Sequence, residues 1–180
     1  MTFKSLLEST TIYHGDNFTT IKLSPKLMNH GNNQEGVGIY FGSLDTAQVY
    51  GKNIISANIN PKKFINSRDP IGKHFESKIK NILFELHKTN NEPLYYDMTD
   101  WGIEVQEPEE VDIFLLGELA HKLKNEQVRN FQVDMANKFG VETFVKVWNK
   151  VLPNIHGTYQ DQSNDTWYAV INTKIKVEKL

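Results

Sequence analysis

The sequence contains no cysteine among its 180 residues. This absence excludes disulfide bridges, thiolate metal sites and a cysteine nucleophile. Disulfide frameworks belong to oxidising compartments, so we expect this protein in the reducing cytoplasm. The chain also lacks the run of about 18 apolar residues that a membrane-spanning helix needs. Residues 1–9 hold no apolar stretch of signal-peptide length, so we expect no membrane partner.

An excess of basic residues is missing as well. Lys and Arg number 20 against 22 Asp and Glu, so the formal net charge is −2. A broad basic surface is typical of dedicated nucleic-acid-binding proteins, and it is not expected here. The six histidines show no metal-ligand spacing and no H-E-x-x-H motif. We therefore predict no metal site.

Hydrophobic residues make up 39% of the chain, which is enough to bury an ordinary core. The length fits one domain over residues 1–180. The first part of this domain is predicted to contain short strands, and in the last of them Ile55, Ala57 and Ile59 lie on one side. Residues 29–38 are rich in Asn and Gly, which predicts a mobile loop. The strands are predicted at residues 10–14, 38–41 and 53–59.

A short helix is predicted over residues 43–50. Ser43 suits its N-cap, and Asp45 complements the positive end of the helix dipole. Gly51 stands where a C′ glycine ends many helices. One strand, one turn and one short helix therefore follow each other directly.

The middle of the chain, about residues 70–152, has the apolar spacing of helices. Segments rich in β-formers at residues 167–171 and 174–177 follow it. Strands at both ends with helices between them predict an α+β fold. The predicted helices begin after Pro70, begin after Pro108 with Glu109, Glu110 and Asp112 in the first turn, and span residues 128–139 and 141–151.

Three local patterns occur in order along the first fifty residues. They are Tyr13-His14-Gly15 at a strand end, Gly36-Val37-Gly38-Ile39-Tyr40-Phe41 at the next strand, and Ala47 to Tyr50 on the short helix. Together they resemble the diphtheria-toxin-like and poly(ADP-ribose) polymerase branch of the ADP-ribosyltransferases. The resemblance is close over about residues 12–50 and looser over the last twenty. It implies a split antiparallel β-sheet domain with a helical insertion at about residues 70–152.

The residue types in these patterns suit NAD. A flat nicotinamide ring is held well between two aromatic faces, which Tyr40 and Tyr50 can supply. Gly15 has no Cβ and can offer its main chain to the carboxamide, and a neutral His14 can bond a ribose hydroxyl. The resemblance implies these same roles, with Thr46 touching the amide.

The resemblance also implies a mechanism. NAD, as co-substrate, would lose nicotinamide through an oxocarbenium-like transition state, and an acceptor would attack the anomeric carbon. Residues 29–38 would line the donor site. Much of the acceleration would come from positioning and electrostatics.

One element departs from the family pattern. Active polymerases of the family carry a glutamate at the start of a late strand. Counting back without a gap puts Thr166 there, whereas a one-residue gap puts Trp167 there; the neighbouring Asp165 could turn inward. Further candidates on the preceding segment, predicted as a loop, are Gln160, Asp161 and Gln162. The candidate catalytic residues are His14, Tyr40, Asp165 and Thr166.

The missing glutamate favours transfer of a single ADP-ribose, or slow NAD hydrolysis, over polymer synthesis. The leading hypothesis is a mono-ADP-ribosyltransferase with a protein or nucleic-acid acceptor, a class that includes bacterial effectors, toxins and phage-encoded host modifiers. The second is a catalytically silent module that binds NAD or ADP-ribose. A third is a structural domain in which the helices bind a partner. An RNA 2′-phosphotransferase ranks lower because basic residues are few.

Two further segments have two interpretations each. The acidic run over residues 104–112 is a solvated loop with a helix start, or an electrostatic docking surface. Asp100-Trp101-Gly102 is a turn with a packing tryptophan, or a loop that binds the acceptor.

Overall fold

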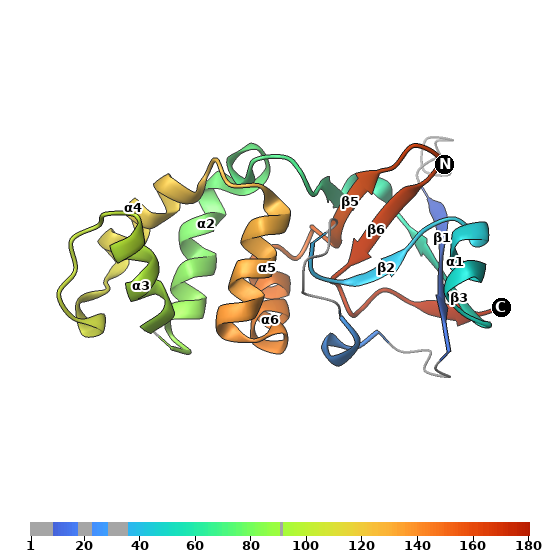
Figure 1. Ribbon diagram of the computed structural model, residues 1–180, viewed down its shortest axis with the longest axis horizontal. Helices are drawn as coiled ribbons and strands as arrows, with labels where there is room; N and C mark the ends of the chain where they lie inside the picture. Colours follow the sequence, from blue (N-terminus) through green and yellow to red (C-terminus); the bar gives the residue numbers. More distant parts are fainter. Residues whose placement is uncertain (1–8, 18–22, 29–35, 91) are drawn as a thin grey trace, which may run out of the picture.

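The computed structural model describes residues 9–17, 23–28, 36–90 and 92–180. This part of the chain holds six α-helices and two β-sheets, so the fold is α+β, as predicted. Five helices gather at one end of an elongated molecule and the two sheets at the other (Figure 1). We refer to these ends as the helical half and the sheet half. None of the helices in the described ranges combines the length and the apolar character needed to span a bilayer.

A three-stranded antiparallel sheet has the order β1-β3-β7. Its central strand has the bounds and the alternation that the sequence predicts, with Ile55, Ala57 and Ile59 buried. The last strand lies later than predicted, because Asn172 accepts the Lys174 main-chain N–H and turns the chain there. The strands are β1 (Thr10–Asp16), β3 (Asn53–Ile59) and β7 (Val177–Lys179).

A four-stranded sheet has the order β2-β6-β5-β4. Strands β4 and β5 pair in parallel, so the prediction of a wholly antiparallel split sheet is wrong. Parallel neighbours need a long crossover connection, and the helical half supplies it between these two strands. Gln160 and Asp161, predicted on a loop before Thr166, form the end of β5, whereas Gln162 follows the strand. The strands are β2 (Ile39–Phe41), β4 (Phe64–Asn66), β5 (Gly157–Asp161) and β6 (Thr166–Val170).

Four of the five helices of the helical half follow from their apolar spacing, and α3 was not predicted. The helix expected directly after Pro108 begins later: residues Pro108–Glu110 form a 3₁₀ turn, and Asp112 caps α4 by accepting the N–H groups of Phe114 and Leu115. The helices are α2 (Ile71–His87), α3 (Glu92–Asp100), α4 (Ile113–Leu123), α5 (Val128–Phe139) and α6 (Val141–Val151).

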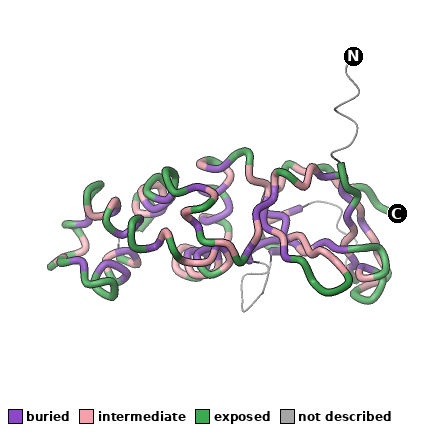
Figure 2. The backbone as a smooth tube through the Cα atoms, turned by 90° about the horizontal axis from the view of Figure 1, so that it is seen from above, coloured by how far each residue is buried: buried purple, intermediate pink, exposed green. Residues whose placement is uncertain are grey.

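Buried residues run through both halves as one cluster (Figure 2). At the junction, the fully buried Gln132 of α5 accepts the main-chain N–H of Val37 at 3.1 Å. Gly36 packs on the same amide with φ of 106°, a conformation that favours glycine. The helical half therefore fixes the start of β2.

Candidate functional site

The two sheets meet at one bridge between β1 and the end of β2. Tyr13 and Gly42 exchange main-chain hydrogen bonds of 2.9 and 2.8 Å. Next to this bridge lies helix α1 (Leu44–Tyr50), which packs on β1. Ser43 caps this helix as predicted and accepts the Thr46 N–H at 3.2 Å.

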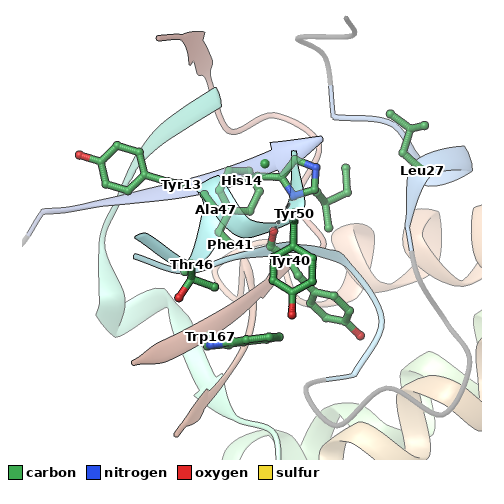
Figure 3. A pocket seen from close by; sticks show the side chains of 12 residues that line it. Tyr13, His14, Leu27, Tyr40, Phe41, Thr46, Ala47, Tyr50 and Trp167 are labelled. Carbon is green, nitrogen blue, oxygen red and sulfur yellow. Dashed lines mark hydrogen bonds between the residues drawn. The ribbon is translucent and has the colours of Figure 1, made fainter. Parts of the chain in front are cut away.

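A pocket of about 310 Å³ opens between β1, β2, β6 and α1. Figure 3 shows the rings of His14, Tyr40, Tyr50 and Trp167 gathered around it, while the Tyr13 ring points away. Five sequence-predicted residues from three separate segments line this pocket: His14, Gly15, Tyr40, Thr46 and Tyr50.

The His14 ring is held by the neighbouring strand. Its Nδ1 lies 2.7 Å from the carbonyl oxygen of Tyr40. A carbonyl only accepts, so Nδ1 carries the proton and the Nε2 of a neutral ring is left with its lone pair. That Nε2 lies 3.7 Å from Asp16 Oδ2. The ring is thus set to accept a hydrogen bond from a hydroxyl group through Nε2.

Gly15 presents its main chain at the free edge of β1. The N–H and C=O of Tyr13 point to Gly42, and in an antiparallel strand every second residue directs these groups to the same edge. The N–H and C=O of Gly15 therefore point away from β3. Within the described ranges, no partner outside the sheet takes them.

Glycine at this position also has a packing reason. A Cβ on Gly15 would overlap the carbonyl oxygen of Ala47 in α1. Gly51 is similar: its φ of −176° is extended, so it is not the predicted left-handed helix end. A Cβ there would overlap the main chain of Asp16. Close contact between β1 and α1 accounts for both glycines.

The two predicted tyrosines differ in how firmly they are held. The Tyr40 hydroxyl donates to the Gly36 carbonyl at 2.6 Å. Tyr50 ends α1 and is 58% exposed. Its ring meets the Trp167 ring edge to face, with centroids 5.9 Å apart and planes at 87°. Tyr40 is therefore a fixed wall, and Tyr50 and Trp167 form the rim.

Asp165 does not line the pocket. Its Oδ2 accepts the Ser43 N–H at 3.0 Å and the Thr46 hydroxyl at 2.7 Å. Burial raises the pKa of Asp165, but these bonds outweigh it and hold the pKa below the ordinary 3.8. The carboxylate therefore joins the start of β6 to the start of α1.

The other polar candidates for the missing glutamate also lie outside the pocket. The Thr166 hydroxyl donates to Asp161 at 2.8 Å, at the end of the β5–β6 hairpin next to its connecting loop. Gln160 is buried inside the sheet, near Ser67. Trp167 is the late-strand residue that lines the pocket.

Some lining residues carried no clear signal in the sequence. Leu27 belongs to a 3₁₀ turn, Pro25–Leu27, that local patterns do not reveal. Ile39 and Phe41 were assigned to the strand and not to the site. Residues 29–35 of the predicted loop, His30 included, lie outside the described residues.

Among the described residues, those that line the pocket include no carboxylate. Among the residues that the structure describes, no group of three or more His, Asp or Glu could hold a metal ion. The pocket combines an imidazole, aromatic rings and main-chain polar groups, which suits a flat ring with an amide and hydroxyls attached.

The comparisons with known proteins do not identify a family for this chain. No protein-family model matches the chain, and no curated protein matches it. A solved structure described as "Crystal structure of an anti-CRISPR protein" aligns over 97% of this chain and 97% of its own, with 11% identity and a TM-score of 0.38. At this TM-score the likeness supports no conclusion about fold or function.

Proposed function

We propose that the pocket binds the nicotinamide end of NAD and that the protein is an NAD-dependent mono-ADP-ribosyltransferase. One observation supports this most. Residues assigned to NAD by their motifs come from β1, β2 and α1, and they line one pocket of about 310 Å³. Unrelated surface residues would have no reason to converge in this way.

In the proposed complex the nicotinamide ring lies against Tyr40 and under Tyr50. The carboxamide bonds the free N–H and C=O of Gly15, and a ribose hydroxyl donates to Nε2 of His14. The Gly15 N–H can donate to the carboxamide oxygen, the Gly15 C=O can accept from its NH₂ group, and Nε2 of His14 can accept from the hydroxyl. Tyr50 is exposed, so it can adjust to the ring without disturbing the core.

The proposed reaction breaks the bond between C1′ of the ribose and the nicotinamide nitrogen. Nicotinamide leaves with the bonding electrons, the acceptor forms a new bond to C1′, and the acceptor's proton passes to solvent. No carboxylate among the described lining residues can activate a further ribose hydroxyl, so single transfer is favoured over chain growth. The acceptor is a macromolecule in this proposal.

The missing carboxylate also favours a second candidate. A pocket in which Trp167 occupies the late-strand position could bind NAD or ADP-ribose without turnover. Such a protein would be a recognition module and not an enzyme.

Mass spectrometry of nicotinamide release separates these candidates. We expect release by the wild type and a clear loss in His14→Ala and Tyr40→Ala, with circular dichroism to verify folding. Val49→Ala is the matched control, because Val49 is 82% exposed on α1 and does not line the pocket. Equal release by all variants would remove the enzyme claim. NAD binding without release over hours would favour the recognition module.

A further inference from the structure

A second hollow of about 700 Å³ lies outside the NAD pocket. It begins on the β1–β3–β7 sheet, where Thr11, Ser56 and Asn58 alternate with the buried residues of the same strands. It continues along the segments that precede β5 and follow β6. We call it the lysine groove, defined by Lys63, His156, Lys174 and Lys176 together with these three polar residues. It shares no residue with the pocket described above.

The charge of the lysine groove is positive, although the chain as a whole carries −2. Its described lining residues include three lysines, Lys63, Lys174 and Lys176, and one carboxylate, Glu178. None of the three ammonium groups forms an ion pair with another described residue. Burial and then the charge of Lys63 lower the pKa of His156, which agrees with a positive potential there.

The hydrogen-bonding groups of the groove are mostly donors. Asn60 uses its amide oxygen to accept the Lys62 N–H, and Asn172 uses its own to accept the Lys174 N–H, each at 2.9 Å. The amide NH₂ group of each side chain is left for a ligand. The hydroxyls of Thr11 and Ser56 add further donors.

We propose that the lysine groove binds a ligand with two or more adjacent phosphate groups. Phosphate oxygens only accept hydrogen bonds, and their charge suits several unpaired ammonium groups. The hollow is much larger than one phosphate, and its cations come from separate segments of the chain. Its described lining residues include no Phe, Tyr or Trp for stacking a base, so the phosphates themselves carry the recognition. This site is additional to the NAD pocket.

Calorimetric titration of the full chain with sodium tripolyphosphate at low salt tests the proposal. We expect the triple variant Lys63→Ala, Lys174→Ala, Lys176→Ala to raise the Kd at least about tenfold. The control, Lys78→Ala, Lys80→Ala, Lys146→Ala, makes the same change in net charge on exposed helix positions. The double variant Lys174→Ala, Lys176→Ala alters exposed residues alone and guards against misfolding.

A second titration with a twelve-residue oligothymidylate distinguishes a nucleic-acid backbone from a free polyphosphate. Groove-dependent binding of either probe supports the proposal and identifies the source of the phosphates. Equal weakening by the groove and control variants, or no binding of either probe, would overturn it. Loss of tripolyphosphate binding in Tyr50→Ala would also overturn it, because the anion would then sit in the NAD pocket. Success or failure here is independent of nicotinamide release.

Discussion

The sheet half and the helical half of the molecule are held together by different kinds of contact. In the helical half, large side chains such as Trp148 and Phe144 are fully buried and pack against one another with tilted rings. In the sheet half, main chain approaches main chain at Gly15 and Gly51. Beside this contact, the N–H and C=O of Gly15 lie at the free edge of β1. A ligand that forms hydrogen bonds with main-chain N–H and C=O groups can bind at such an edge. A core of packed side chains has no free main-chain groups for such a ligand.

The largest effect that we expect comes from adding one methyl group at this contact. In Gly15→Ala the Cβ overlaps the Ala47 carbonyl, so we expect a loss of about 3 kcal/mol in the free energy of unfolding. Gly117→Ala is the matched change in the helical half, where a Cβ meets only the Lys80 side chain at 3.5 Å. That variant should gain about 0.5–1 kcal/mol, because alanine is the better helix former.

Urea denaturation of both variants measures this difference. Similar changes in the unfolding midpoint for Gly15→Ala and Gly117→Ala would contradict the distinction between the two halves.

A smaller effect concerns two carboxylates, one in each half, whose pKa values shift in opposite directions. The Asp165 pKa is lowered by its bonds to Thr46 and Ser43, against the effect of burial. The Asp97 pKa is raised by burial, which outweighs the bond from Lys138, and its Oδ2 has no hydrogen-bond partner among the described residues. The ordinary value for both groups is 3.8.

The two shifts predict opposite dependences of stability on pH. A lowered folded pKa gives stability that is present above 3.8 and lost as pH falls through the folded pKa, so Asp165→Asn should weaken this acid loss. A raised folded pKa gives stability that is present below 3.8 and lost as pH rises through the folded pKa. Asp97→Asn should therefore gain stability relative to wild type as pH rises.

Denaturation of the wild type and the two variants from about pH 2.5 to 6 gives these slopes. If Asp165→Asn and Asp97→Asn change the pH dependence of the free energy of unfolding in the same direction, the two carboxylates do not have opposite pKa shifts.

Local patterns in the sequence predicted the parts of the fold that depend on near neighbours. Helices α5 and α6 have the predicted bounds, because Gly140 separates two segments with clear apolar spacing. Strand β3 follows from its alternation. Helix α3 was missed because its buried residues include Asp97, which looks exposed in the sequence. Strand β5 was missed for a similar reason, since Gln160 is buried in it.

The candidate site likewise contains residues that local patterns predicted and residues that they did not. His14, Gly15, Tyr40 and Tyr50 stand in recognisable local motifs, and they line one pocket. The direction of Asp165 depends on Ser43 and Thr46, more than a hundred residues away. No local pattern contains that contact, so its orientation could not be predicted. Trp167 became a candidate only by counting residues back along the late strand with a one-residue gap.

Calorimetric titration with NAD tests the central claim most directly. Tyr50 and Tyr96 are equally exposed, at 58% and 57%, but Tyr50 lines the pocket of the sheet half and Tyr96 lies on α3. The account predicts that Tyr50→Ala weakens NAD binding by up to about tenfold, as loss of one stacking contact implies, and that Tyr96→Ala leaves it unchanged. Equal affinities for both variants, or no binding of millimolar NAD by the wild type, would contradict it.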